Sequence, residues 1–198
     1  MKRSLALVLA LSACAESNTH HDAGPGAADA GHDASSSVAT DAFTASGGLV
    51  VNEIEATGTE FVELTNTGSA PIDLSALRIT DDDGGMPNAS HATMFPSGVV
   101  LHTGDRLVIV THVDNPPSGL QTGSDCTITG VDRCLLVSFG LSNADGDAAY
   151  VLASDDSVVA EATYPAMGAP DGSSYCRIPD GTGSFATCTP TPGAANAM

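Results

Sequence analysis

The chain has 198 residues, a length that accommodates one domain of ordinary size together with additional segments. It carries 24 Asp and Glu residues against 6 Lys and Arg, for a formal net charge of −18 at pH 7. So acidic a surface repels phosphate groups, which argues against nucleic acid as a partner and against adsorption to anionic lipid headgroups. We therefore expect partners that are cationic or neutral, or that are bridged by divalent ions.

Residues 1–13 have the pattern of an export signal. Two basic residues precede the apolar run 5–11, which is far shorter than the roughly 20 residues that a membrane-spanning helix needs. Residues 11–14, LSAC, resemble the lipobox of bacterial lipoproteins. That resemblance implies that Cys14 is acylated, becomes the first residue of the mature protein and anchors it to a membrane. The alternative is a free secreted protein, because residues 13–15 also fit an ordinary cleavage site.

Residues 14–48 predict a flexible tether. They are rich in Ala, Gly, Ser and Asp, and hold too few large apolar residues to offset the entropy cost of ordering. Ala15 stands where an Asp would retain a lipoprotein at the inner membrane in some bacteria, so we expect the outer membrane or the cell surface. His20, His21 and His32 lie near acidic residues and could hold a metal ion weakly, although spacer polarity is the simpler interpretation.

From residue 49 onward, short apolar or alternating runs recur between clusters of Gly, Pro, Asn and Asp. Their length and their content of Val, Ile, Leu and Thr are typical of an all-β sandwich, and no window shows a sustained helical period. Residues 81–99, 112–134 and 164–190 are expected to form longer loops. The expected strands are 49–55, 60–66, 72–80, 93–95, 107–111, 135–139, 148–152 and 158–164.

Four cysteines remain after Cys14, and an even number in an exported chain suggests two disulfides. Three connectivities are formally open. We favour the two local pairings, Cys126 with Cys134 and Cys176 with Cys188. A four-cysteine metal site is the competing interpretation, and the absence of any C-x-x-C spacing in the sequence disfavours it.

The segment TEFVELTNTG, residues 59–68, places Glu60 and Glu63 three positions apart within an apolar run. A glycosidase-type acid pair must flank one bond from a common cleft. Side chains alternate along a strand, so these two carboxylates are expected on opposite faces of the sheet. We therefore interpret both as structural residues.

Several segments resemble, in order, the bacterial lamin tail domain. They are LVVNEIE at 49–55, TEFVELTNTGSAPIDLSALRITDDDG at 59–84, FPSGVVLHTGDRLVIV at 95–110, FGLSNADGDAAYVLASDDSVVAEATY at 139–164, SSYCRIPDGTGSF at 173–185 and TPTPGAAN at 189–196. The resemblance covers residues 49–196 and implies an immunoglobulin-like β-sandwich that serves as an accessory or interaction module. It implies no catalytic residues. The cysteine-bearing insertion 112–134, and Phe61 where the family commonly has Trp, depart from the pattern.

No motif of a known nucleophile, zinc or nucleotide site occurs in the sequence. The histidines that follow the tether, His91, His102 and His112, are expected at the surface in separate positions. We therefore predict that the protein is not an enzyme and that it needs no cofactor.

Calcium is the remaining metal candidate, since hard cations bind clustered carboxylate oxygens in turns. The alternative is that these residues simply form turns and keep the surface soluble. The spacing of Asn143, Asp145 and Asp147 fails as an EF-hand, because Ala148 and Ser154 stand at its sixth and twelfth positions. The candidate residues are Asp81, Asp82, Asp83, Asp145, Asp147, Asp155 and Asp156.

Together these features favour a non-enzymatic binding or adhesion module displayed on the cell envelope. Its expected partner is an envelope or extracellular protein. The chain has three tyrosines, Tyr150, Tyr164 and Tyr175, and no Trp, which provides poorly for stacking against sugars. Two alternatives are a structural envelope component without a dissociable ligand and an accessory subunit of a separate extracellular hydrolase.

Overall fold

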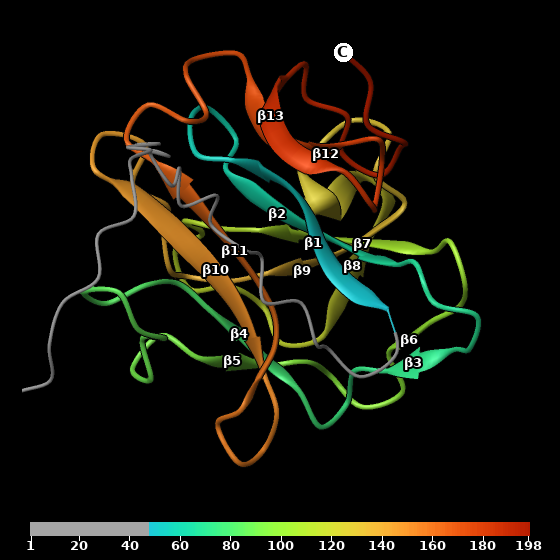
Figure 1. Ribbon diagram of the computed structural model, residues 1–198. Helices are drawn as coiled ribbons and strands as arrows, with labels where there is room; N and C mark the ends of the chain where they lie inside the picture. Colours follow the sequence, from blue (N-terminus) through green and yellow to red (C-terminus); the bar gives the residue numbers. More distant parts are fainter. Residues whose placement is uncertain (1–47) are drawn as a thin grey trace, which may run out of the picture. The chain divides into compact units, whose positions relative to one another are not determined.

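The computed structural model describes residues 48–198 (Figure 1). The predicted signal sequence, Cys14 and the histidines of the tether lie outside the described residues, so those predictions stay predictions. Within residues 48–198, no helix is long and apolar enough to cross a membrane.

Two larger β-sheets form most of the domain, and a third sheet has two short strands. The larger sheet has seven strands in the order β13-β12-β1-β2-β7-β9-β8, and only the β7–β9 pair is parallel. Its strands are β1 (Leu49–Glu55), β2 (Phe61–Asn66), β7 (Arg106–Val110), β8 (Leu120–Thr122), β9 (Arg133–Leu136), β12 (Ser174–Ile178) and β13 (Ser184–Cys188).

The smaller sheet has four antiparallel strands in the order β11-β10-β4-β5. They are β4 (Arg78–Thr80), β5 (Thr93–Met94), β10 (Gly146–Leu152) and β11 (Val158–Pro165). In Figure 1, β10, β4 and β5 are labelled below and to the left of β1, β2 and β12. A separate two-stranded ladder joins β3 (Ile72–Asp73) to β6 (Val100–Leu101), and one 3₁₀ helix, η1, covers Gly123–Cys126.

The main core lies between the two larger sheets. Along the strands of each sheet, every second side chain is apolar and points into this core. Val62 and Leu64 of β2 pack in the same cluster as Ala149 and Val151 of β10. This period-2 burial is the pattern that the sequence shows, and the predicted all-β sandwich is confirmed.

A β-bulge in β1 changes which residues face this core. Val51 pairs with Leu64, but the next paired residue is Glu53, so Asn52 is the extra residue of the bulge. Regular alternation from Val51 would turn Glu53 toward the core. The bulge instead turns Ile54 inward and leaves Glu53 opposite Glu63, on the far face of the larger sheet.

That far face is covered by two segments. The insertion packs Cys126 and Val131 against Phe61 and Val108 of the sheet. The C-terminal residues 189–198 lie over Glu53 and Glu63 and are held by hydrogen bonds described below. Both disulfides have the pairing that the sequence favours, Cys126 with Cys134 and Cys176 with Cys188. The second bridge joins β12 to β13.

Three expectations about secondary structure are wrong. Residues 72–80 form two strands in different ladders, because the chain turns between them and Leu77 N–H donates to the Leu74 carbonyl at 2.8 Å. The expected loop 112–134 contains β8 and η1, and the expected loop 164–190 contains β12 and β13. Strands β8, β12 and β13 are short and carry Gln, Ser, Arg and Thr, so their apolar alternation is too weak to identify them from the sequence.

Candidate functional site

Two glutamates are fully buried on the far face of the larger sheet. Glu53 of β1 and Glu63 of β2 are direct cross-strand partners, and each has 0% of its surface exposed. Like charges placed opposite each other across a sheet are unfavourable, and burial adds to that cost. The hydrogen-bond partners of the two carboxyl groups therefore determine their ionisation and their role.

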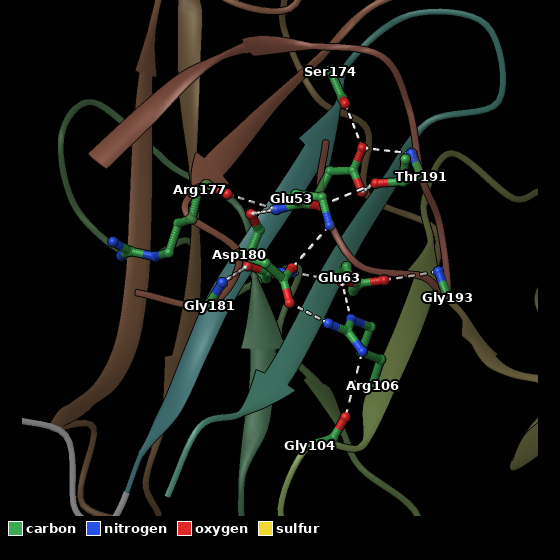
Figure 2. A network of polar contacts seen from close by, with 12 residues as sticks. Glu53, Glu63, Gly104, Arg106, Ser174, Arg177, Asp180, Gly181, Thr191 and Gly193 are labelled. Atoms are coloured by element: carbon green, nitrogen blue, oxygen red, sulfur yellow. Dashed lines mark hydrogen bonds and ion pairs between the residues drawn. The ribbon is translucent and has the colours of Figure 1, made fainter. Parts of the chain in front are cut away.

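Glu53 accepts hydrogen bonds from both sides. Figure 2 shows its carboxyl group between Ser174 of β12 and Thr191 of the C-terminal segment. The Ser174 hydroxyl donates to Oε1, while the Thr191 N–H and hydroxyl donate to Oε1 and Oε2 at 2.9 and 3.1 Å. Burial raises the pKa of Glu53 above 4.5, and these donors act in the opposite direction.

Glu63 holds the next turn of the same segment. Its Oε2 accepts the Gly193 N–H at 2.7 Å, and its Oε1 accepts the Asn52 side-chain amide at 2.8 Å (Figure 2 shows the contact to Gly193). Gly193 has φ +80°, a conformation that glycine adopts without strain. The Arg106 Nε lies 3.4 Å from Glu63 Oε1. Burial raises the pKa of Glu63 to about 7, against the opposing effects of Asn52, Gly193 and Arg106.

Asp180 completes this network from the β12–β13 turn. Its Oδ1 accepts the Asn52 side-chain amide and the Asn196 N–H, each at 3.0 Å, and its Oδ2 pairs with Arg106. Partial burial would raise the pKa of Asp180, but the hydrogen bonds from Asn196 and Asn52 and the charge of Arg106 lower it below 3.8.

We call this arrangement the C-terminal clasp: the carboxyl groups of Glu53, Glu63 and Asp180, and the segment 191–196 that they hold. Asn196 closes it by donating its side-chain amide to the carbonyls of Asn52 and Arg177, both at 3.1 Å. Every carboxylate oxygen of the clasp has a donor or cation from the protein itself. The clasp therefore stabilises the fold and leaves none of these carboxylates to a substrate.

Glu60 has a separate set of partners. Its Oε2 accepts the Leu141 N–H at 2.9 Å, and its Oε1 lies 3.2 Å from Nδ1 of His112. None of these groups contacts Glu63, so the structure does not bring the two glutamates together as an acid pair. His112, like His91 and His102, is exposed.

The calcium candidates form turn hydrogen bonds. Asp81 pairs with His91 at 2.8 Å, and Asp82 accepts the Gly85 N–H at 2.9 Å and the Tyr150 hydroxyl at 3.2 Å. Asp147 accepts three backbone N–H groups, among them that of Asp82.

The remaining candidates are placed similarly. Asp155 accepts the N–H and hydroxyl of Ser157, Asp156 pairs with Arg78, and Asp145 interacts with Ser142. Asp83 donates its backbone N–H to the Met86 carbonyl. The described part of the chain contains no group of three acidic, His or Cys side chains arranged to hold a metal ion.

The outer face of the smaller sheet exposes two large apolar side chains. One row of cross-strand partners runs across all four strands, from Met94 through Arg78 and Leu152 to Val158. Met94 is 54% exposed and Val158 is 43% exposed, while Leu152 between them is buried. The two ends of the row are thus apolar and open to solvent.

The loop that follows β4 carries another exposed apolar side chain, away from this row. Residues 81–92 fold back beside Tyr150, because Asp82 accepts the Tyr150 hydroxyl and Thr80 donates to the Asn88 carbonyl at 2.6 Å. Met86 of this loop is 67% exposed. The Asp82 N–H donates to Asp147, so this loop lies by the start of β10, whereas Leu152 is the last residue of that strand. We call the surface of the row from Met94 to Val158 the methionine face. Of the five large apolar side chains exposed in residues 48–198, it carries two.

Comparison with known families identifies the fold. The family model of the lamin tail domain matches residues 42–166, which is more than half of the chain. The chain belongs to the lamin tail domain family. Its sandwich is accordingly immunoglobulin-like, as the resemblance implies. A search of curated proteins found no match.

The methionine face lies inside the residues that the family model matches, and the C-terminal segment of the clasp lies outside them. The lamin tail domain match includes the whole smaller sheet, and with it the methionine face, whereas β12, β13 and the segment 191–196 follow it. An immunoglobulin-like lamin tail domain is consistent with a protein-interaction module without catalysis.

The tyrosines of this lamin tail domain offer no open stacking platform. Tyr150 and Tyr164 are buried at 7% and 1% exposure. Tyr175 is half-buried and stacks on Phe185, with ring centroids 5.0 Å apart and Arg177 on the same ring at 4.4 Å. The expectation that sugars are not the partner is untested and stays a prediction.

Proposed function

We propose that this protein is a lipid-anchored component of the cell envelope whose lamin tail domain binds another protein and catalyses no reaction. The observation that carries the proposal is the methionine face. Exposed apolar patches with a polar surround mark protein-interaction sites, and methionine is enriched in interfaces because its flexible, polarisable side chain adapts to a partner.

The use of the acidic side chains supports the non-enzymatic part of this proposal. A catalytic carboxylate must face a substrate, whereas Glu53, Glu63 and Asp180 face the chain's own C-terminal segment. Glu63, whose pKa burial raises to about 7, is fully buried and accepts hydrogen bonds from Asn52 and Gly193.

The sequence of the first 14 residues supports the anchoring part. In this proposal Cys14 is acylated, and residues 15–47 hold the domain away from the outer membrane or cell surface. Growth with labelled palmitate tests it. The wild-type chain should incorporate label, and the Cys14→Ser variant should not. Equal labelling of both, or none in either, would favour the free secreted protein.

The binding part is tested by capture from solubilised envelope, with the full chain immobilised at several densities. The informative variant replaces Met94 by Gln, which keeps side-chain size while removing apolar character. The matched control is Met167→Gln, since Met167 is 60% exposed but lies outside the methionine face. We expect one saturable partner that the wild type and the control retain and the Met94→Gln variant loses. If nothing binds above background, a structural envelope component becomes the better account.

A further inference from the structure

We propose that a cavity beside the C-terminal clasp binds a small zwitterion of the amino-acid type, and that Arg133 holds the carboxylate of this ligand. Three parts of the chain line the cavity: the start of β7 with the turn before it, the end of the insertion, and Gly193 of the clasp. The cavity is separate from the methionine face, and binding there is independent of the proposed function.

The cavity lies where two neighbouring strands of the larger sheet begin. Strands β7 and β9 are parallel neighbours, so their first residues, Arg106 and Arg133, lie at the same end of the sheet. Figure 2 shows Arg106 with Gly104 and Gly193, two glycines that line the cavity with it. A Cβ added at Gly193 would lie 3.7 Å from the insertion, so the clasp closes one side. The cavity volume of about 470 Å³ is within the range of small-molecule sites.

Arg133 lines this cavity, and its guanidinium has no partner among residues 48–198. The other three arginines of these residues, Arg78, Arg106 and Arg177, are bound to carboxylates or to backbone carbonyls. No side-chain hydrogen bond or ion pair joins Arg133, which is half-buried, to another described residue. A partly desolvated guanidinium gains from a carboxylate, whose two oxygens match its fork of N–H groups.

Acidic residues line the same cavity. Asp105 is half-buried and Asp132 is exposed, and no ion pair joins either of them to a cation within residues 48–198. Asp105 Oδ2 accepts the His102 N–H at 2.9 Å, which fixes this carboxylate in the turn before β7. The cavity therefore offers a ligand both a guanidinium and carboxylates.

This mixture of charges decides which class of ligand fits. A simple oxyanion such as phosphate is attracted to Arg133 but repelled by Asp105 and Asp132. A simple cation leaves the guanidinium of Arg133 without a partner. A zwitterion brings its carboxylate to Arg133 and its ammonium group to Asp105 or Asp132, so that each charge meets an opposite one.

The test uses the full chain labelled with ¹⁵N-arginine, whose Nε–H signals are assigned by single Arg→Lys substitutions. The probe is an equimolar mixture of neutral L-amino acids, added up to about 10 mM to detect dissociation constants in the millimolar range. Two matched mixtures carry one charge each, because their amino groups are acetylated or their carboxyl groups amidated. We expect the zwitterions to shift the Arg133 signal in a saturable way and to leave the Arg78 signal unchanged. Each singly charged mixture should bind at least about tenfold more weakly.

Variants of the cavity separate the two charges, with the amide signals of Gly130 and Gly193 as the readout. Arg133→Gln should weaken binding of the zwitterions by about tenfold or more, whereas the control Arg78→Gln, on the smaller sheet, should bind as the wild type does. Asp132→Asn should weaken binding of the zwitterions but not of the acetylated mixture. Unchanged amide signals of β10 verify that each variant is folded.

Several results would overturn the proposal. They are the absence of saturable shifts with the zwitterions, or equal losses of affinity in Arg133→Gln and Arg78→Gln. Equally tight binding of the acetylated mixture would identify a site for simple anions and refute the zwitterion. None of these results bears on capture through Met94, so the proposed function is tested separately.

Discussion

Replacing Glu63 by Gln should change how the stability of the domain depends on pH. Burial raises the pKa of Glu63 from 4.5 to about 7 in the folded protein. Between these two values the folded state holds a proton that the unfolded state has released. The free energy of unfolding of the wild type therefore falls as pH rises through this window.

The size of the effect follows from the shift. At about 1.4 kcal/mol per pH unit, Glu63 lowers the free energy of unfolding by about 2 to 3 kcal/mol between pH 5 and pH 8. The Gln side chain does not ionise, so the variant lacks this loss. It retains an oxygen that can accept from Gly193 or Asn52 but meets the other donor with its amide, which costs on the order of 1 kcal/mol at every pH.

Urea unfolding of both proteins at pH 5, 6, 7 and 8, with the disulfides intact, measures this difference. We expect the variant to gain about 2 to 3 kcal/mol relative to the wild type across that range. Val110→Ala is the control, because Val110 is a buried apolar residue of β7 outside the clasp, and its loss should be the same at every pH. A constant difference between Glu63→Gln and wild type would show that Glu63 is already ionised in the fold at pH 5, and the reasoning would be refuted.

Three other changes give separate tests. Asn196→Ala removes the two hydrogen bonds that its side-chain amide donates and the one that its Oδ1 accepts from Thr191, and it should cost about 1 to 3 kcal/mol. Exchange of the Thr191 amide, measured by NMR, should become faster; unchanged exchange would contradict the clasp. Joint replacement of Cys126 and Cys134 by Ser should lower the free energy of unfolding by about 2.5 kcal/mol in urea, because the closed loop between them no longer restricts the unfolded chain. Millimolar calcium or EDTA should move the thermal midpoint of unfolding by no more than about 1 °C, since the candidate aspartates already accept hydrogen bonds from the protein. A rise of several degrees with calcium would indicate a calcium site.

The sequence predicts the sandwich well because most core strands alternate. Val62 and Leu64 point one way and Glu63 the other, and period-2 reading assigns them correctly. The same alternation, applied to β1, would turn Glu53 toward the core, because it assumes no bulge at Asn52. A bulge depends on pairing with a neighbouring strand, which a single strand's pattern does not contain.

The clasp and the methionine face depend on contacts between distant parts of the chain. Glu53 and Thr191 are 138 residues apart in sequence, so no local pattern joins them. An Asn-Glu step within a strand and a C-terminal Thr-Pro-Gly segment are both visible in the sequence, but neither indicates that it binds the other. Met94 and Val158 lie on the same face because the pairing of β5, β4, β10 and β11 puts them in one cross-strand row.

The two faces of the sandwich therefore differ in role. The far face of the larger sheet is closed by the insertion and by the clasp, whose polar groups satisfy one another. The outer face of the smaller sheet exposes Met94 and Val158. In the proposed function, this second face is the one that contacts a partner.

Photo-crosslinking in intact cells tests the binding claim most directly. A photoreactive amino acid replaces Met94 in one full chain and Met167 in another, both exposed in the free protein. The account predicts one discrete crosslinked protein from position 94 and none of comparable yield from position 167. No adduct at position 94, or the same adducts from both positions, would contradict a binding site on the methionine face.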